Sequence, residues 1–251
     1  TTIFIGIESP RKASLQETKK TQNMRGDLVE NVRKIQSYGI QVQAGMIVGF
    51  DNDDASIFAE QLRFIQDARI PVSMTGMLQA LPKTPLHDRM AKEGRLVAES
   101  VGDQFVFSNI LPKTMSRIEL YKGYRALIAE LYEFRNFRRR TLEFILNRGR
   151  QVGDRVRPRR KELLLLARIF KDTVLAASPR RAWFTLSLVG TTLWKHPARF
   201  ADAVSFALVH KGLYEYMQSL DHHLERVIRE IEEHGAALSR ASGPTLAPAH
   251  A

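Results

Sequence analysis

The sequence predicts an α/β fold: part of a (β/α) barrel, made of three parallel strands with helices, followed by an all-α domain. Three apolar segments, at Phe4–Ser9, Gly45–Asp51 and Leu78–Leu86, each end in polar or turn-forming residues, as parallel strands do where they deliver a binding site. Helical periodicity separates these segments, and from Met115 onward it continues nearly to the end of the chain. This alternation indicates parallel βαβ units, and three strands make part of a barrel rather than a closed one.

The first half alternates strands and helices in a regular order. The expected strands are Thr2–Glu8, Gln41–Val48 and Val72–Leu78, with helices on one side of the sheet only. Asp27 can cap a helix that Gly39 stops, and either Asp54 or Ser56 starts the next one. A short helix is expected near Pro85–Lys92, followed by an irregular segment up to Pro112.

The second half is predicted to be helical. The expected helices are Met115–Tyr132, Phe134–Arg148, Arg159–Ala177, Pro179–Trp194, Pro197–Ser219 and Asp221–Leu238. Residues 1–110 carry 13 Lys/Arg and 13 Asp/Glu, whereas residues 111–251 carry 25 and 14, so the whole basic excess belongs to the second half. We therefore divide the chain into a barrel part (1–112), a helical domain (113–238) and a tail (239–251) whose Ala, Pro, Ser and Gly content predicts disorder.

Composition excludes several classes of site. The chain has no Cys, which excludes disulfides, thiolate metal sites and Cys nucleophiles. The longest uncharged apolar stretch, Ala182–Trp194, is 13 residues long, whereas a transmembrane helix needs about 20. The sequence contains no Gly-rich phosphate loop and no zinc-protease motif. It also shows no signal peptide, so we expect a cytoplasmic protein, which could bind the membrane surface.

Two charged or polar clusters invite functional interpretations. Residues Arg135 to Lys161 include eleven Lys/Arg against two acids, a density that can grip phosphate backbones or anionic lipid headgroups. The nearby Phe134, Phe137 and Phe144 fit the buried face of a helix better than a base-stacking platform, so nucleic acid is disfavoured. The side chains of His222 and His223 would point about 100° apart on a helix, which argues against a metal site formed by both.

The strongest local pattern is Gly45-x-Ile47-x-Gly49-Phe50-Asp51-Asn52-Asp53. Glycines at the end of a strand let a ligand approach the backbone closely, and the acidic residues that follow can cap the next helix. The alternative is a plain barrel strand followed by a capped helix.

Taken together, four segments resemble a known enzyme family. They are Phe4-Ile5-Gly6-Ile7-Glu8-Ser9, Lys19-Lys20-Thr21-Gln22-Asn23, Gly45–Asp51 and Leu78-Gln79-Ala80-Leu81-Pro82-Lys83-Thr84-Pro85-Leu86. In order and spacing they resemble the second half of the radical S-adenosylmethionine (SAM) barrel, in the cobalamin-dependent class with a helical C-terminal domain of unknown function. The chain departs from the family pattern in two ways. The CxxxCxxC cluster motif is absent, and Lys83 replaces the usual Gly of a PxPGTPL segment.

The resemblance implies a set of site residues. Glu8 and Ser9 would face the ribose or methionyl part of SAM, since a carboxylate can accept hydrogen bonds from its ammonium or hydroxyl groups. Ile47 and Val48 would flank the adenine, and Gly49 would make room for it. Leu78 would lie at the end of the sixth barrel strand, and Gln22 and Asn23 would face the substrate or cobalamin; no residue is assigned to a metal. The alternative for Gln22 and Asn23 is a surface turn with solvated Lys side chains, which is the commoner role for each residue taken singly.

The resemblance also implies the chemistry. The family cleaves SAM at a [4Fe-4S] cluster to a 5′-deoxyadenosyl radical, and its cobalamin-dependent members often methylate unactivated carbons. The chain would then be a C-terminal fragment, inactive alone, whose partner is the N-terminal half with the cluster and cobalamin regions, acting on a small-molecule or lipid substrate. A non-catalytic scaffold and a binder of anionic surfaces remain the alternatives.

Overall fold

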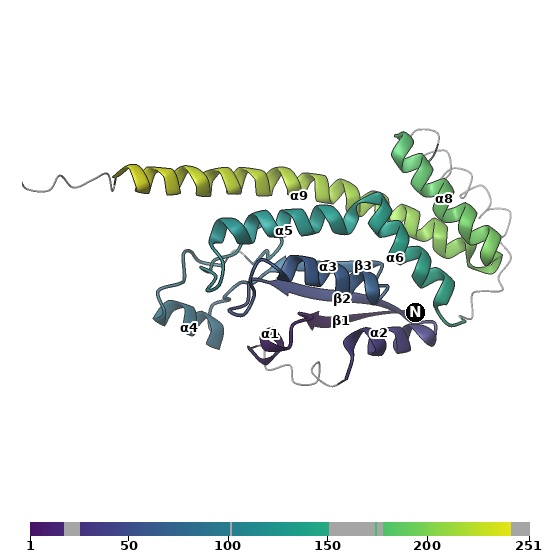
Figure 1. The fold of residues 1–251 in the computed structure, drawn as a ribbon, viewed down its shortest axis with the longest axis horizontal. Helices are drawn as coiled ribbons and strands as arrows, with labels where there is room; N and C mark the ends of the chain where they lie inside the picture. Colours follow the sequence, from purple (N-terminus) through teal and green to yellow (C-terminus); the bar gives the residue numbers. More distant parts are fainter. Residues whose placement is uncertain (18–25, 101, 151–173, 175–177, 242–251) are drawn as a thin grey trace, which may run out of the picture.

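The first part of the protein is a small parallel sheet. The computed structural model describes residues 1–17, 26–100, 102–150, 174 and 178–241. Its strands, in the order β1-β2-β3, cover Thr2–Glu8, Gln41–Val48 and Val72–Met77 (Figure 1). The predicted parallel strands are confirmed, with the third ending one residue early, and the sheet of the described residues does not close into a barrel.

The two faces of the sheet differ. Along β2, buried side chains alternate with half-buried ones, and the buried set is Val42, Ala44, Met46 and Val48. Helices α2 (Leu28–Ser37), α3 (Ile57–Asp67) and α5 (Arg117–Tyr132) all contribute to the hydrophobic core that includes this set. The other face remains open, and Phe4 and Met74 on it are 57% and 45% exposed. We call it the open face.

The outer edge of β3 is closed by hydrogen bonds from elsewhere in the chain. The hydroxyls of Tyr132 and Tyr124, both on α5, donate to the carbonyls of Ser73 and Thr75 at 2.5 and 3.0 Å. The Met77 N–H donates to the carbonyl of Gln104 at 2.8 Å. These bonds satisfy backbone groups that an edge strand would otherwise leave unpaired, so the sheet ends at β3.

The helices of the first part begin at the predicted residues. The Asp27 side chain caps α2 by accepting from two backbone N–H groups, and α3 begins after Ser56. Thr84 caps α4, which covers Pro85–Lys92 as expected. A further short helix, α1 (Lys12–Glu17), follows β1 and was not predicted. It is six residues long, too short to show a periodic pattern.

The second part is helical. It contains α5, α6 (Phe134–Asn147), α8 (Pro179–Lys195), the 3₁₀ turn η4 (Pro197–Arg199) and α9 (Phe200–Ala241). In Figure 1, α9 runs alongside α5 and extends beyond it. Among the described residues, no helix combines the length and the hydropathy that crossing a bilayer requires.

One prediction about these helices is wrong. The expected pair Pro197–Ser219 and Asp221–Leu238 is a single helix, α9, which begins three residues later, after η4. No Gly or Pro interrupts the sequence near residue 220, and Leu220 is 3% exposed, so the apolar stripe passes through the expected break. The expected helix Arg159–Ala177 and the tail from residue 242 lie outside the described residues, whereas 239–241 belong to α9.

Several arginines of the basic segment act inside the helical packing. Arg148 forms an ion pair with Asp202, and Arg138 donates to the side chains of Ser187 and Thr191 on α8. Arg140 is fully buried, and burial lowers its pKa to about 10; its guanidinium stands 4.8 Å from the centre of the Phe137 ring. These residues hold helices together rather than forming a solvated surface.

A buried histidine lies in the same region. His210 on α9 is 0% exposed, its Nε2 lies 2.9 Å from the carbonyl oxygen of Tyr132, and three phenylalanine rings surround it. Burial lowers its pKa to about 4, so it is neutral at pH 7. His210 is therefore part of the packed core of the helical region.

Candidate functional site at the carboxyl ends of the strands

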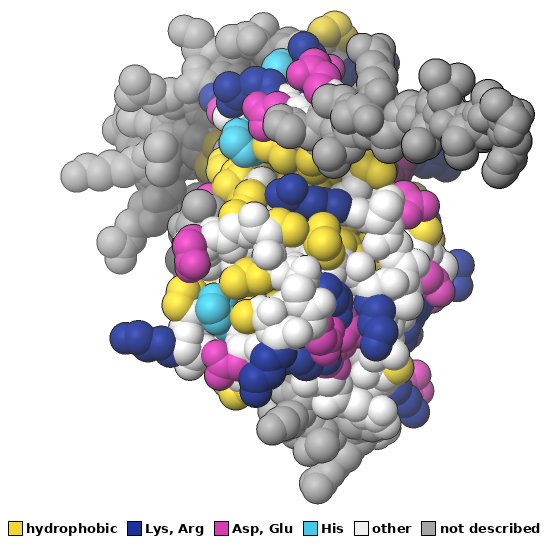
Figure 2. All heavy atoms as spheres, turned by 90° about the vertical axis from the view of Figure 1, so that its left-hand side faces the viewer, with side chains coloured by type: hydrophobic (Ala, Val, Ile, Leu, Met, Phe, Trp, Pro, Cys, Tyr) yellow, Lys and Arg dark blue, Asp and Glu magenta, His cyan; other side chains and the backbone are white. Residues whose placement is uncertain are grey.

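The carboxyl ends of the three strands meet at one end of the molecule. Figure 2 looks onto this end, where basic and acidic side chains lie next to one another below a group of apolar ones. Binding sites in open α/β sheets lie outside the carboxyl ends of their strands. We therefore describe the side chains at this end as the candidate site.

Glu8 and Ser9 end β1 in an irregular conformation. Glu8 has a φ of 69°, and the pairing with β2 shifts register between Gly6 and Glu8. A positive φ is uncommon for a residue with a side chain, and such strain often occurs at functional sites. Ser9 is 0% exposed, and its Oγ accepts from the N–H of Arg11 at 3.2 Å. Glu8 thus stands at the strand end, whereas Ser9 shapes the following turn.

The predicted residues of β2 and β3 divide between two environments. Ile47 lies on the open face and packs beside Leu78 and Phe50 in a small apolar cluster under α4. Val48 is 0% exposed and faces the helix layer, and its carbonyl accepts from the Leu78 N–H at 2.8 Å. The structure therefore brings Ile47 and Leu78 together and turns the Val48 side chain away from them.

Gly49 makes a backbone turn that other residues rarely adopt. Its φ is 101°, and a Cβ built there would lie 3.3 Å from Leu120 and 3.7 Å from Leu78. Its N–H donates to Asp53 at 3.0 Å. The protein itself thus uses both the space beside Gly49 and its donor.

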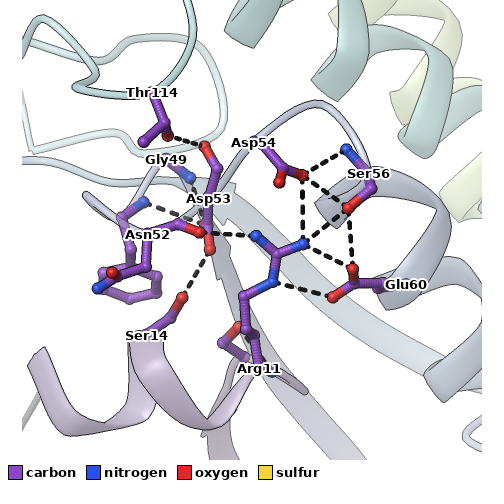
Figure 3. A network of polar contacts seen from close by, with 11 residues as sticks. Arg11, Ser14, Gly49, Asn52, Asp53, Asp54, Ser56, Glu60 and Thr114 are labelled. Carbon is purple, nitrogen blue, oxygen red and sulfur yellow. Dashed lines mark hydrogen bonds and ion pairs between the residues drawn. The ribbon is translucent and has the colours of Figure 1, made fainter.

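Asp53 organises the loop that follows β2. Its Oδ1 accepts from the Ser14 hydroxyl at 2.7 Å, and its Oδ2 accepts from the N–H groups of Gly49 and Phe50 at 3.0 and 3.1 Å (Figure 3). The Thr114 hydroxyl donates to its carbonyl at 2.5 Å. Burial raises the pKa of Asp53, while these hydrogen bonds act in the opposite direction. Asp53 therefore joins three segments of the chain, α1 and the loop after β2 through its carboxylate and the segment at Thr114 through its backbone carbonyl.

Arg11 holds the loop after β1 against the loop after β2. Its guanidinium donates to both carboxylate oxygens of Glu60, at 3.1 and 2.6 Å, and to the carbonyl of Asn52 at 2.6 Å. The hydrogen bonds from Arg11 to the carboxylate lower the pKa of Glu60. Because all three guanidinium nitrogens donate to protein groups, Arg11 acts as a positioning residue.

A second polar network forms the outer rim. Asp51 pairs with Arg95 at 2.5 Å and with Arg89 at 3.0 Å, and Arg89 also pairs with Glu17 at the end of α1. Glu17 in turn accepts from the N–H of Asp51 at 3.0 Å. Burial opposes ionisation of Asp51, but the two arginines hold its pKa below the ordinary value. An open cavity of about 790 Å³ borders Glu17, Asp51, Arg89 and Lys113.

The turn after β3 keeps a glycine-like geometry. Lys83, which stands where the related family has Gly, has a φ of 66°. Thr84 then donates to the Leu81 carbonyl at 2.7 Å and caps α4. Lys83 therefore adopts a left-handed backbone conformation that glycine adopts most readily.

Other predicted site residues cannot be placed. Gln22 and Asn23 lie outside the described residues. The described residues contain no group of three or more His, Cys, Asp or Glu that could hold a metal ion, and on α9 His222 Nδ1 lies 2.6 Å from the Gln218 carbonyl oxygen.

Sequence reasoning missed the residues that build the loops. Arg11, Arg89 and Arg95 contact carboxylates that are far away in the sequence, 49 residues for Arg11–Glu60 and 72 residues for Arg89–Glu17. No spacing rule connects such residues, and the acidic run after Gly49 was the one available signal.

Comparison with known proteins places the chain in a family. Residues 84–226 match a family described as a domain of unknown function (DUF4070). The chain is 47% identical over 96 residues to the hopanoid C-2 methylase of Rhodopseudomonas palustris (strain TIE-1), which covers 38% of this chain and 18% of that protein. It is 36% identical over 149 residues to an uncharacterized methyltransferase of Synechocystis sp., covering 59% of this chain and 28% of that protein.

The matches define what is related and what is not. No solved structure matches the chain at a significant level. The matched regions span less than a third of the length of the two curated relatives. The family match covers more than half of the chain, and it begins before the end of the predicted barrel part. The chain therefore belongs to the DUF4070 family and is related to the C-terminal part of cobalamin-type radical SAM methylases.

Proposed function

We propose that this chain forms one wall of the active site of a radical SAM methylase, with SAM bound against the open face near the strands' carboxyl ends. The observation that carries the proposal is the one-sided sheet. Helices cover one face, while Phe4, Ile47 and Met74 line the other, and Glu8 is the last residue of β1 at the carboxyl end of the sheet. An apolar wall with a carboxylate at its edge suits a purine nucleoside that carries an ammonium group.

The residues at this place fit SAM in part. Ile47 offers an apolar surface to the adenine, and the Glu8 carboxylate can accept hydrogen bonds from ribose hydroxyls or the ammonium group. Gly49 cannot offer its N–H to the base, because that group donates to Asp53. Bound SAM would supply the methyl group or the 5′-deoxyadenosyl radical. Asp53 and Arg11 would keep the two loops that border the site in place.

The implied iron–sulfur cluster does not fit this chain. The sequence contains no Cys, and thiolates are the usual ligands of such clusters. We propose that a polypeptide segment with a CxxxCxxC motif, in the same or a neighbouring chain, supplies the cluster and the cobalamin region. The described residues single out no group for cobalamin, so we derive no step through it.

The names of the two relatives support a proposal for the substrate class. One relative is named for a hopanoid, which is a polycyclic lipid, and the other is named only as a methyltransferase. We propose a lipid or another small apolar molecule as the methyl acceptor.

The proposal is tested by co-expressing the chain with a cysteine-bearing segment and measuring SAM retention and 5′-deoxyadenosine formation. Both should require both parts, and Glu8→Gln should weaken SAM binding roughly tenfold, because it removes a charge-assisted hydrogen bond. The matched control is Glu30→Gln on α2, which should change neither. Failure of the combined parts to retain SAM would favour a non-catalytic scaffold.

The chain alone offers a simpler check. After reconstitution with iron and sulfide it should show no thiolate-to-iron absorbance, roughly near 400 nm, and should not cleave SAM. A stoichiometric cluster on the isolated chain would contradict the proposal.

A further inference from the structure

Helix α8 carries an exposed apolar face. Trp183 and Trp194 are 71% and 82% exposed, and Leu186 and Leu193 are 44% and 45% exposed. At about 100° per residue, these four side chains fall within an arc of roughly 100° on one side of the helix. The opposite side is buried against α6 and α9 through Phe184, Thr185, Leu188 and Thr192. We call the exposed set, Trp183, Leu186, Leu193 and Trp194, the α8 face.

The surroundings of the α8 face are basic. No Asp or Glu occurs between Thr173 and Ala201. Arg135, Arg180 and Lys195 are exposed, and their side chains form no hydrogen bond or ion pair with the described residues. Because these cations have no ion-pair partner among the described residues, their charge can attract an anionic partner.

A cavity beside Trp183 connects the α8 face with two of these cations, Arg135 and Arg180. It has a volume of about 610 Å³ and lies between α6 and α8, with Trp183, Phe134, Arg135 and Arg180 in its lining. The carboxylate in the lining is that of Glu133, which accepts from two N–H groups at the start of α6. An anionic group entering the cavity would therefore meet guanidinium groups beside an aromatic wall.

We propose that the α8 face and this cavity dock the protein on the surface of an anionic phospholipid bilayer. Tryptophan and leucine side chains would enter the headgroup and upper acyl region, and a lipid phosphate would lie against Arg135 and Arg180. The charge pattern favours this partner over two others. A second copy would bring like charges together at the α8 face, and a nucleic acid would leave its apolar side chains uncovered.

The chain provides its own reporter for this contact. Its two tryptophans, Trp183 and Trp194, both belong to the α8 face. Vesicles of phosphatidylcholine with phosphatidylglycerol should shift their emission to shorter wavelength, and brominated lipid should quench it. Phosphatidylcholine vesicles, or high salt, should greatly reduce both effects, because the cations supply part of the attraction.

Two sets of variants separate the apolar and the charged contributions while keeping both tryptophans. Leu186→Ser with Leu193→Ser should weaken vesicle binding by roughly tenfold per leucine. Arg135→Gln with Arg180→Gln should weaken binding to anionic vesicles by roughly fivefold per charge removed. The matched control for the apolar set is Tyr38→Ser, and the control for the charged set is Lys34→Gln with Lys92→Gln. All of these controls should bind vesicles nearly as tightly as the parent.

Each outcome decides the proposal. An unchanged emission spectrum with anionic vesicles at low salt would overturn it, as would variants that bind like the parent. Inorganic phosphate that competes fully with vesicles would indicate an anion site without membrane docking. Self-association through the α8 face in sedimentation velocity, or tighter binding to duplex DNA than to vesicles, would replace the bilayer with that partner.

Discussion

At the scale of single residues, carboxylates at the strand ends are committed to the protein itself. Asp53 is buried and accepts three hydrogen bonds through its side chain, and Asp51 forms ion pairs with two arginines. Their pKa values move in opposite directions, because burial dominates at Asp53 and the arginines dominate at Asp51. Polar residues near a strand end are thus not all available to a ligand, because the fold itself uses Asp51 and Asp53.

We predict that Asp51→Asn lowers the free energy of unfolding at pH 7 by about 1–2 kcal/mol, because it removes charge-assisted hydrogen bonds. The pKa of Asp51 is below its ordinary 3.8 in the folded protein, so its contribution is present above that pH and is lost as the pH falls below it. Urea unfolding of the parent and the variant should therefore show a gap that narrows below pH 3.8.

Glu30→Gln on the exposed side of α2 provides the control. It should leave the free energy of unfolding nearly unchanged at pH 7 and at acidic pH. A gap between the Asp51→Asn variant and the parent that stays constant with pH would contradict the charge-based explanation.

At the scale of elements, α5 joins the sheet to the helical domain. Its tyrosines close the edge of β3, and its other side contacts α9. The buried residues of both parts form one hydrophobic cluster, which runs from Ile7 on β1 to Ile228 on α9. The division into barrel part and helical domain at 112 remains a prediction, since a shared core does not by itself decide independent folding.

The contact of α5 with α3 depends on a glycine. A Cβ built at Gly123 would lie 2.0 Å from the Phe58 ring, so Gly123→Ala forces the ring to move. We expect a loss of about 1–3 kcal/mol in the free energy of unfolding, measured by thermal or denaturant unfolding.

Gly212→Ala on α9 is the matched control, because nothing lies within 4 Å of the Cβ built there. Alanine favours helix by up to about 1 kcal/mol over glycine, so this variant should be slightly more stable. Equal effects of the two substitutions would show that the packing argument is wrong.

At the scale of the whole molecule, the open face leaves apolar surface without a cover in the described residues. Phe4 is 57% exposed and its ring lies over Gly45, where a Cβ would come within 2.8 Å of it. β1 pairs with β2 alone and forms the other edge of the sheet. Such a combination of apolar face and strand edge favours association.

We predict that the isolated chain self-associates and that Phe4→Gln with Met74→Gln reduces this, because both changes make the open face polar. Sedimentation velocity across a concentration series measures the effect. Leu186→Ser with Leu193→Ser tests whether the α8 face contributes instead. A monodisperse parent that melts cooperatively as a monomer would contradict the prediction and favour the scaffold alternative.

The sequence alone determined the strands, most helix ends and the family. These features depend on local chemistry, such as the Asp27 cap, the alternation along Gln41–Val48 and the turn at Lys83–Thr84. The expected break before Asp221 was wrong, because the apolar stripe continues through Leu220 within the single helix α9.

Only the tertiary structure decided which polar and apolar groups are free. It placed Arg11 against Glu60 and Asp53 against Ser14, and it turned Val48 towards the helices and Ile47 towards the open face. It also buried Arg140 and left the α8 face exposed. The physical reason is that ion pairing and burial depend on neighbours far away in the chain, which no local pattern of residues specifies.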